Sequence, residues 1–277
     1  MLKKYVKVSC IDEYESYECD ICIWCTLYFD YEKAKKIIRA KKNYAWVHSM
    51  PRAFENCLLD NGDFVKDMDE FICVSEAVLN TLNVNKPSVV IHNFVDTNIS
   101  LLANEKNPYE IYSDKLKLVT VSRLSRGKGF ERIRMMTQQL DNLKIDYIWM
   151  VIGNGRSMEN EIKSWFVDND KVIFEGKKSN PYTYIKNADY LVQLSDDESW
   201  GIVISESLEL HTPVVVTNFL SSKEQVIDGF NGIIVNLNEK DYSNYIFRMS
   251  SEIKKLKQNI QNFKYKNEID KWLEELN

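Results

Sequence analysis

Long apolar runs are missing from this chain of 277 residues, and no segment approaches the length of a membrane span. The start, MLKKYVKVSC, has two lysines but lacks the continuous apolar core of a signal peptide. An excess of basic residues is also missing. The formal net charge is −5, which argues against general nucleic-acid binding because such binding uses a basic face. We therefore expect a cytoplasmic protein, with peripheral contact at the inner face of a membrane left open.

Histidine is scarce, and this limits the chemistry that the sequence can support. The three histidines form no Ser-His-Asp arrangement and no cluster with metal-ligand spacing. The acidic triplet Asp196–Asp197–Glu198 could hold a divalent cation. Adjacent residues of an extended loop point in different directions, however, so a solvated loop is the favoured interpretation.

The six cysteines all lie within the first 73 residues. Cys19, Cys22 and Cys25 are three positions apart, a spacing found in part of some iron–sulfur ligand runs. The fourth cysteine followed by proline is missing, and alternation along a strand would point Cys19 and Cys22 to opposite faces. Reduced structural cysteines are therefore favoured over a metal or cluster, also for the remaining Cys10, Cys57 and Cys73.

Residues 1–98 contain short apolar runs between helical patterns, which favours a small N-terminal domain with a parallel α/β sheet. One helix is predicted over 31–42. A shorter one is predicted over 76–82, with Ser75 as its N-cap. Strands are expected in the runs 6–10, 20–25, 44–48, 71–75 and 88–92.

The pattern becomes regular only later in the chain. Residues 99–114 have no clean period, are rich in asparagine and are predicted to be an interdomain linker. From 115 to 240, six strands alternate with helices, as in one doubly wound domain. The charged segment 241–277 is predicted to be helical. Strands are expected at 116–121, 147–152, 172–174, 190–194, 214–217 and 233–235, and helices at 130–140, 157–166, 181–187, 201–210 and 222–227.

The first turn of this second domain has the sequence SRLSRGKG. Arg123 follows the strand at 116–121, and Lys128 precedes the helix at 130–140. A helix N-terminus with Arg and Lys suits a diphosphate, because both the N–H groups and the side chains attract anions. A solvated basic turn is the alternative, and the residues alone leave both open. At Gly153–Asn154–Gly155, a plain tight turn is favoured over close approach to a ligand.

Two glutamates, Glu198 and Glu206, flank the start of the predicted helix 201–210. Glu198 lies in the loop after a strand, and ligands of open parallel sheets bind at the carboxyl ends of strands. Ionised carboxylates offer only acceptors, which suits hydroxyl-rich ligands such as sugars. The alternative is that acidic residues favour the positive end of a helix. His48 ends a strand-like run and could face a cleft between the domains, although most lone histidines have no chemical role.

The motifs follow one another in a specific order: YAWVHSMPR, FICVSEAV, VVIHNFVD, VSRL with KG, VIGNG, FEG, the Glu198–Glu206 pair, TPVVVTN and DGFNGIIV. In this combination the chain resembles the retaining glycosyltransferase family 4, of the glycosyl transferases group 1, over roughly residues 40–240. The resemblance implies a GT-B-like α/β fold. In that fold two Rossmann-like parallel-sheet domains face a cleft, and here the N-terminal one would be reduced.

The resemblance also implies roles for individual residues. Arg123 and Lys128 would bind the donor diphosphate and stabilise the negative charge on the leaving nucleotide. Glu206 would accept hydrogen bonds from the ribose. Glu198 would face the transferred sugar, and His48 would serve as a catalytic histidine in the cleft. Further donor contacts are implied for the backbone at Trp200, Gly201 and Ile202, for the pocket-shaping Gly153 and Gly155, and for Lys177 near the base.

These roles predict a retaining glycosyltransferase that moves a sugar from a UDP- or GDP-linked donor to an acceptor saccharide or lipid-linked saccharide. Bacterial surface polysaccharide assembly is the associated process. The resemblance implies no cofactor and no bound metal, because Arg123, Lys128 and the helix dipole would stabilise the negative charge that a metal cation otherwise stabilises. Two alternatives stay open, a non-catalytic nucleotide-sugar-binding or scaffold subunit and a sugar-nucleotide epimerase of the same fold.

The N-terminal part departs from the family pattern. Family members begin with a strand and a glycine-rich turn and have a longer first domain, whereas here only Gly62 precedes Gly127. We therefore expect a fragment, a naturally reduced acceptor domain, or a chain that works with a partner protein.

Overall fold

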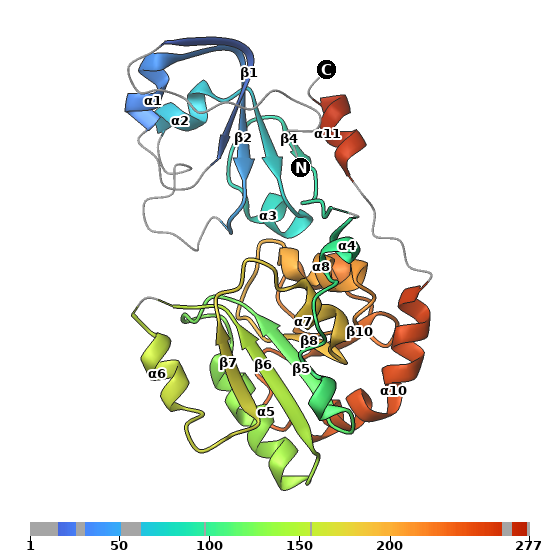
Figure 1. Ribbon diagram of the computed structural model, residues 1–277. Helices are drawn as coiled ribbons and strands as arrows, with labels where there is room; N and C mark the ends of the chain where they lie inside the picture. The colour runs from blue at the N-terminus through green and yellow to red at the C-terminus, as the bar shows by residue number, and fades with distance from the viewer. Residues whose placement is uncertain are drawn as a thin grey trace. The chain divides into compact units, whose positions relative to one another are not determined.

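The computed structural model describes residues 16–25, 31–50, 62–96, 98–155, 157–261 and 268–275. The chain divides into two compact units, one of residues 1–96 with 267–277 and the other of residues 97–266 (Figure 1). Each unit contains a parallel sheet, which confirms the predicted pair of parallel-sheet α/β domains. The strand expected over 6–10, and Cys10 and Cys57, lie outside the described residues. No helix in the described ranges is long and apolar enough to cross a bilayer.

The first unit has four parallel strands in the order β1-β2-β3-β4. Its elements are β1 (Tyr17–Cys25), α1 (Tyr31–Ile37), β2 (Ile38–Val47), α2 (Gly62–Asp67), β3 (Glu70–Cys73), α3 (Glu76–Thr81) and β4 (Ser88–Val90). The predicted cap of α3 is confirmed, since Val78 N–H donates to Ser75 Oγ at 3.0 Å. Cys19 and Cys25 are exposed and Cys22 is half-buried, as alternation along β1 requires.

The helix predicted over 31–42 is wrong in its second half. The chain leaves α1 at Ile37 and continues directly as β2, whose residues 38–43 pair in parallel with 17–22 of β1. An ion pair of 2.6 Å between Lys41 and Asp20 joins the two strands. Charged side chains suit the exposed face of a helix or of a strand, so pairing with a distant segment decides the conformation here.

The second unit has six parallel strands with interleaved helices. Every strand and helix predicted between 115 and 240 is confirmed, with ends that differ by at most two residues. The elements are α4 (Ile99–Leu102), a 3₁₀ turn (Glu110–Tyr112), β5 (Leu116–Val121), α5 (Phe130–Asn142), β6 (Tyr147–Ile152), α6 (Glu159–Ser164), β7 (Val172–Gly176), α7 (Tyr182–Asn187), β8 (Tyr190–Gln193), α8 (Ile202–Glu209), β9 (Val214–Thr217), α9 (Ser222–Gln225), β10 (Gly232–Val235) and α10 (Ser243–Gln261).

The strand order of this sheet is β10-β9-β8-β5-β6-β7, so β5 and β8 lie side by side at its centre. From β5 the chain adds β6 and β7 on one side, and from β8 it adds β9 and β10 on the other. The order therefore reverses between β5 and β8. In open α/β sheets, ligands bind in the crevice beyond the carboxyl ends of the strands at this switch point.

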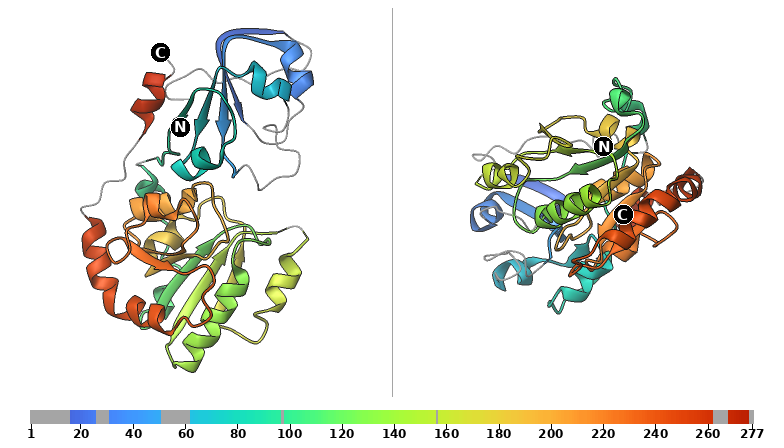
Figure 2. Two further views of the ribbon diagram at one scale, coloured as in Figure 1. Left: turned by 180° about the vertical axis from the view of Figure 1, so that it is seen from behind. Right: turned by 90° about the horizontal axis from the view of Figure 1, so that it is seen from below.

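Helices cover both faces of the six-stranded sheet, with α5 and α10 on one face and α7 on the other (Figure 2). Buried polar side chains also join the central strands. The indole N–H of Trp149 on β6 donates to Thr120 Oγ1 on β5 at 3.0 Å, and Thr120 donates to Val192 O on β8 at 2.8 Å. Both side chains are almost fully buried, so the paired polar atoms connect three neighbouring strands at little desolvation cost.

The predicted linker 99–114 belongs to the second unit. Tyr109 is fully buried there, and its hydroxyl donates to Leu118 O at 3.5 Å. Asn180 donates to Leu102 O at 2.8 Å, which ties α4 to the loop before α7. A few buried side chains anchor this segment, and they are too widely spaced to create a sequence period.

The predicted C-terminal segment 241–277 is divided between the two units. Ile246, Met249 and Leu256 attach α10 to the core of the second unit. The following helix, α11 (Ile269–Glu275), belongs to the first unit, where the ring of Trp272 lies 4.8 Å from that of Trp46.

Candidate active site

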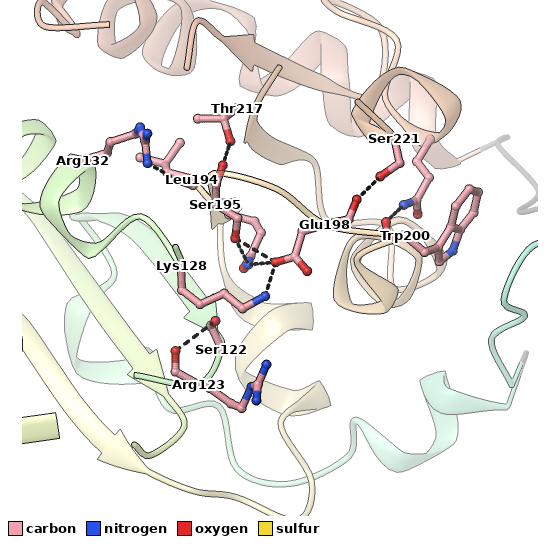
Figure 3. Close-up of polar contacts among 12 residues, drawn as sticks. Ser122, Arg123, Lys128, Arg132, Leu194, Ser195, Glu198, Trp200, Thr217 and Ser221 are labelled. Atoms are coloured by element: carbon pink, nitrogen blue, oxygen red, sulfur yellow. Dashed lines mark hydrogen bonds and ion pairs between the residues drawn. The ribbon is translucent and has the colours of Figure 1, made fainter. Parts of the chain in front are cut away.

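The loops that follow β5 and β8 bring the predicted phosphate-binding and sugar-binding side chains together. Arg123 and Lys128 come from the β5–α5 loop, and Glu198 comes from the β8–α8 loop, 70 positions after Lys128 (Figure 3). Arg123 is exposed, and its side chain extends in the same direction as that of Lys128. The reversal of strand order at β5 and β8 is the reason that these distant residues meet.

Lys128 and Glu198 form an ion pair, with Nζ 2.7 Å from Oε1. The two side chains are 18% and 14% exposed, so the pair is largely shielded from solvent. Two neutral groups donate to the same oxygen, Gln193 Nε2 at 3.0 Å and Ser195 Oγ at 2.8 Å. Three donors on one carboxylate oxygen hold the Glu198 side chain in a defined orientation.

Side chains of neighbouring elements hold the backbone of the β8–α8 loop. Arg132 on α5 donates to Leu194 O at 3.2 Å and to the Asp196 carboxylate at 2.6 Å. Ser221 Oγ donates to Glu198 O at 2.7 Å (Figure 3). A loop fixed in this way presents its charged group without further reorganisation. Two more bonds of this kind run from Thr217 to Ser195 O and from Gln225 to Trp200 O.

Gly129 allows the two loops to approach each other. Its φ is +76°, and a Cβ at this position would lie 1.8 Å from Leu194 O. The loops also bond directly, since Asp196 N–H donates to Gly127 O at 2.8 Å. At Gly129, therefore, the absent side chain makes room for the backbone of the β8–α8 loop.

Helix α8 begins at Ile202, four residues after Glu198, and its N-cap residue makes no side-chain cap bond. Its N-cap is Gly201, with φ +74°, and Gly201 has no side chain to accept from the first N–H groups. Such a helix start attracts anions. Ile202 is 41% exposed, whereas Trp200 is 2% exposed and donates from its indole to Ser205 Oγ at 3.0 Å. A donor contact at Trp200 would therefore involve its backbone.

Glu206 lies on α8 and is half-buried. Burial raises the pKa of Glu206 above its usual value, and a hydrogen bond from Tyr182 OH to Oε1, at 3.2 Å, counteracts part of that rise. An ionised carboxylate has four acceptor positions, so the phenol leaves acceptor capacity for the hydroxyls of a ligand.

The glycines of the β6–α6 loop have a packing role. A Cβ would lie 1.8 Å from Ser122 O at Gly153 and 2.3 Å from Leu124 O at Gly155. These glycines therefore let the β6–α6 loop lie directly against the loop of Arg123 and Lys128, and their predicted role in shaping a nucleotide pocket stays a prediction. Lys177, which directly follows β7, is exposed.

His48 directly follows β2 in the first unit. Its ring lies 4.0 Å from the ring of Trp46, and burial lowers the pKa of His48 to about 4. The imidazole is therefore neutral at physiological pH, with one donor and one acceptor nitrogen. Its catalytic role in a cleft stays a prediction.

The acidic triplet 196–198 is divided among different partners. Asp196 pairs with Arg132, and Glu198 pairs with Lys128. Burial raises the pKa of Asp197. Within the part of the chain that the structure describes, no group of three or more His, Cys, Asp or Glu side chains is arranged to hold a metal ion.

Sequence reasoning missed four residues of the site, namely Gln193, Ser195, Arg132 and Tyr182. Only Gln193 had a visible signal, because it is a lone amide in the otherwise apolar strand YLVQ. The others resemble ordinary polar residues of loops and helix surfaces, and only the fold reveals their contacts with the β8–α8 loop, Glu198 and Glu206.

Comparisons with known proteins agree with this arrangement. The family described as Glycosyl transferases group 1 matches residues 103–266, almost the whole second unit, and the chain belongs to this family. An uncharacterized glycosyltransferase, MJ1178 of Methanocaldococcus jannaschii, is 30% identical over 177 residues, covering 61% of this chain and 46% of that protein. LpsE of Rhizobium meliloti, a lipopolysaccharide core biosynthesis glycosyltransferase, is 23% identical over 183 residues, covering 64% of this chain and 52% of LpsE.

Solved structures show the same fold. The crystal structure of Anabaena Alr3699/HepE in complex with UDP and glucose has a TM-score of 0.68 at 19% identity, covering 79% of this chain and 66% of that one. The structural neighbours are GT-B glycosyltransferases, and the predicted GT-B-like fold is confirmed. The chain spans about half the length of the curated relatives that it matches.

Proposed function

We propose that this protein is a retaining glycosyltransferase of family 4 that transfers a sugar from a nucleoside-diphosphate sugar to an acceptor saccharide. The observation that carries the proposal is the shielded Lys128–Glu198 pair at the switch point between β5 and β8. A cation and a carboxylate at this point suit the two parts of the donor that react, the diphosphate and the sugar.

Lys128 and Arg123 would bind the donor diphosphate. As the bond between the sugar and the diphosphate breaks, negative charge grows on the leaving phosphate, and fixed cations lower the energy of that state. The start of α8, whose N-cap is Gly201, adds backbone N–H groups, which carry partial positive charge. These groups supply what a bound metal would otherwise provide, so we expect chelation of divalent cations to leave turnover unchanged.

Glu198 would accept hydrogen bonds from the transferred sugar, and Glu206 from the ribose. In front-face transfer the acceptor hydroxyl attacks from the side on which the nucleotide leaves, so the configuration at the sugar carbon is retained. The neutral donors Gln193 and Ser195 would keep the Glu198 carboxylate in position while these bonds change.

We propose UDP as the nucleotide, with GDP as the alternative, because the Anabaena protein of the same fold is crystallised with UDP and glucose. We propose a saccharide or lipid-linked saccharide as the acceptor, in the assembly of a surface polysaccharide, because a relative is named for lipopolysaccharide core biosynthesis. Action in the cytoplasm, with peripheral contact at the inner face of the membrane or with a partner protein, would fit such an acceptor.

The test is donor binding and nucleotide release across UDP-, GDP-, ADP- and CMP-sugars, for the wild type and two lysine variants. Lys128→Ala should lower nucleotide release by roughly 100-fold or more, as for loss of one preorganised charge at a reacting group. Lys163→Ala is the matched control, because Lys163 forms an ion pair of the same length, 2.7 Å, with Glu159 on α6. It should release nucleotide at the wild-type rate.

The outcomes separate the competing functions. Binding of one donor with nucleotide release supports a transferase, whereas binding without release in the presence of saccharide acceptors supports a scaffold subunit. Conversion of one nucleotide sugar into another without acceptor supports an epimerase. Wild-type rates in Lys128→Ala would contradict the site assignment.

A further inference from the structure

Gln193 is the last residue of β8 and is 2% exposed. The strand residues before it, Tyr190, Leu191 and Val192, are fully buried. An amide in such a place is costly unless its polar atoms are bonded. A leucine or valine would suit the packing, so the contacts of the amide need a separate explanation.

Those contacts converge on Glu198. Gln193 Nε2 donates to Glu198 Oε1 at 3.0 Å and to Ser195 Oγ at 2.7 Å. Ser195, which is fully buried, donates in turn to Glu198 Oε1 at 2.8 Å. The amide at the end of β8 and the hydroxyl in the β8–α8 loop thus form a buried pair of neutral donors to the Glu198 carboxylate.

The oxygen of the Gln193 amide takes no part in these contacts. Gln193 Oε1 is buried and has no hydrogen-bond partner among the described residues. A buried unpaired acceptor is destabilising. The N–H group of Gln193 therefore makes the contacts that favour glutamine at this position, although the amide oxygen stays unpaired.

Lys128 is the third donor to the same carboxylate oxygen, and it is also the residue proposed to bind the diphosphate. A lysine that turns toward phosphate oxygens would weaken its bond to Glu198. Gln193 and Ser195 are neutral and are not proposed to bind the diphosphate, so they can hold the Glu198 carboxylate when Lys128 does not.

We infer that Gln193 is a positioning residue that acts through Glu198, holding its carboxylate toward the transferred sugar independently of Lys128. This inference rests on the proposed function. It assigns to Gln193 the part of donor recognition that distinguishes a nucleotide sugar from the free nucleotide.

The test compares calorimetric affinities for UDP-glucose and UDP, or for the GDP pair if the donor panel identifies GDP. Gln193→Met keeps the length of the side chain and removes its N–H groups. We expect roughly 10-fold weaker binding of the nucleotide sugar, as for loss of a hydrogen bond to a charged group, and an unchanged affinity for the nucleotide.

Thr120→Val is the matched control. Thr120 is a buried polar residue that donates to Val192 O, next to Gln193, and among the described residues it makes no hydrogen bond to Glu198. Its loss should leave the ratio of the two affinities at the wild-type value. An equal change of the ratio in both variants would overturn the inference, because it would show a general effect on β8.

A double-mutant cycle tests whether Gln193 acts through Glu198. In a Glu198→Ala background, adding Gln193→Met should change the affinity for the nucleotide sugar by less than roughly 2-fold, because the partner is already missing. The full loss in both backgrounds would overturn the inference.

The same cycle measured by urea unfolding needs no nucleotide. If the wild type bound no nucleotide sugar, the proposed function would fail. The unfolding cycle would still test whether Gln193 and Glu198 interact. Coupled unfolding free energies for residues 193 and 198 support the positioning contact, and additive ones contradict it.

Discussion

At the residue scale, the two glutamates of the site have different surroundings. Glu198 receives three hydrogen bonds on one oxygen, including one from Lys128. Glu206 is half-buried and accepts a hydrogen bond from the phenol of Tyr182. Glu198 is therefore held in place by its partners, whereas burial raises the pKa of Glu206 and leaves that carboxyl sensitive to pH.

This difference predicts how donor binding depends on pH. In the proposed role Glu206 accepts from ribose hydroxyls, and an ionised carboxylate is the stronger acceptor because protonation turns one of its oxygens into a donor. Donor affinity should therefore fall as pH drops through the raised pKa of Glu206. Tyr182→Phe removes the hydrogen bond that counteracts the rise, and the fall should then begin at a higher pH. Calorimetric titrations with the nucleotide at several pH values would measure the shift.

Tyr184→Phe is the matched control for that experiment. Tyr184 lies on the same helix, and its hydroxyl donates to Glu175 Oε2 at 3.0 Å instead of to Glu206. Its loss should leave the pH at which binding falls unchanged. The assignment of Glu206 to the ribose would be wrong if both variants, or neither, shifted that pH.

At the element scale, the site depends on the close approach of the β5–α5 and β8–α8 loops. The adjacent strands β5 and β8 bring the loop ends together, and Gly129 removes the steric barrier between their backbones. The bonds from Arg132 and Ser221 then hold the second loop. The backbone positions of the two loops therefore determine the geometry of the Lys128–Glu198 pair.

Gly129→Ala should therefore destabilise the protein by more than about 3 kcal/mol, because it adds a backbone clash to the strain of a positive φ. Gly176→Ala is the control, since Gly176 has φ +71° but a Cβ there would meet no atom within 4 Å. It should cost only about 1–2 kcal/mol. Urea unfolding would measure both, and equal losses would show that the clash with Leu194 is relieved by movement of the loop.

At the scale of the whole molecule, the second unit contains every contact of the Lys128–Glu198–Glu206 site that the structure describes. It is also larger than the domain predicted from the sequence, because it includes the segment 97–114 and helix α10. The matched family region, 103–266, has nearly the same limits.

This division predicts that a fragment of residues 97–266 folds by itself and binds the free nucleotide. A fragment of residues 115–240 should fail to fold, because it lacks Tyr109 and the buried face of α10. Each large buried side chain contributes roughly 1.5–3 kcal/mol, and whole domains are stable by only about 5–15 kcal/mol. Cooperative thermal unfolding and calorimetry would test both fragments against the full chain. A cooperative transition in the shorter fragment would contradict the unit boundary.

Local sequence determined most of the second unit. The strands at 116–121, 147–152 and 214–217 were predicted with their observed ends, because buried parallel strands are continuous apolar runs bounded by turn residues. The loop positions of Arg123, Lys128 and Glu198 followed from the same pattern. The order of the motifs also predicted membership of the glycosyl transferases group 1.

Only the tertiary structure decided which of these pieces meet. Pairing with β1 made residues 38–42 a strand although their local pattern is helical. Reversal of the strand order placed the loops of β5 and β8 together, and buried contacts attached 99–114 and α10 to the second unit. The role of Gln193 became visible only through its bonds to Ser195 and Glu198. Such pairings depend on side chains far apart in the chain, and a local sequence pattern carries no information about its distant partner.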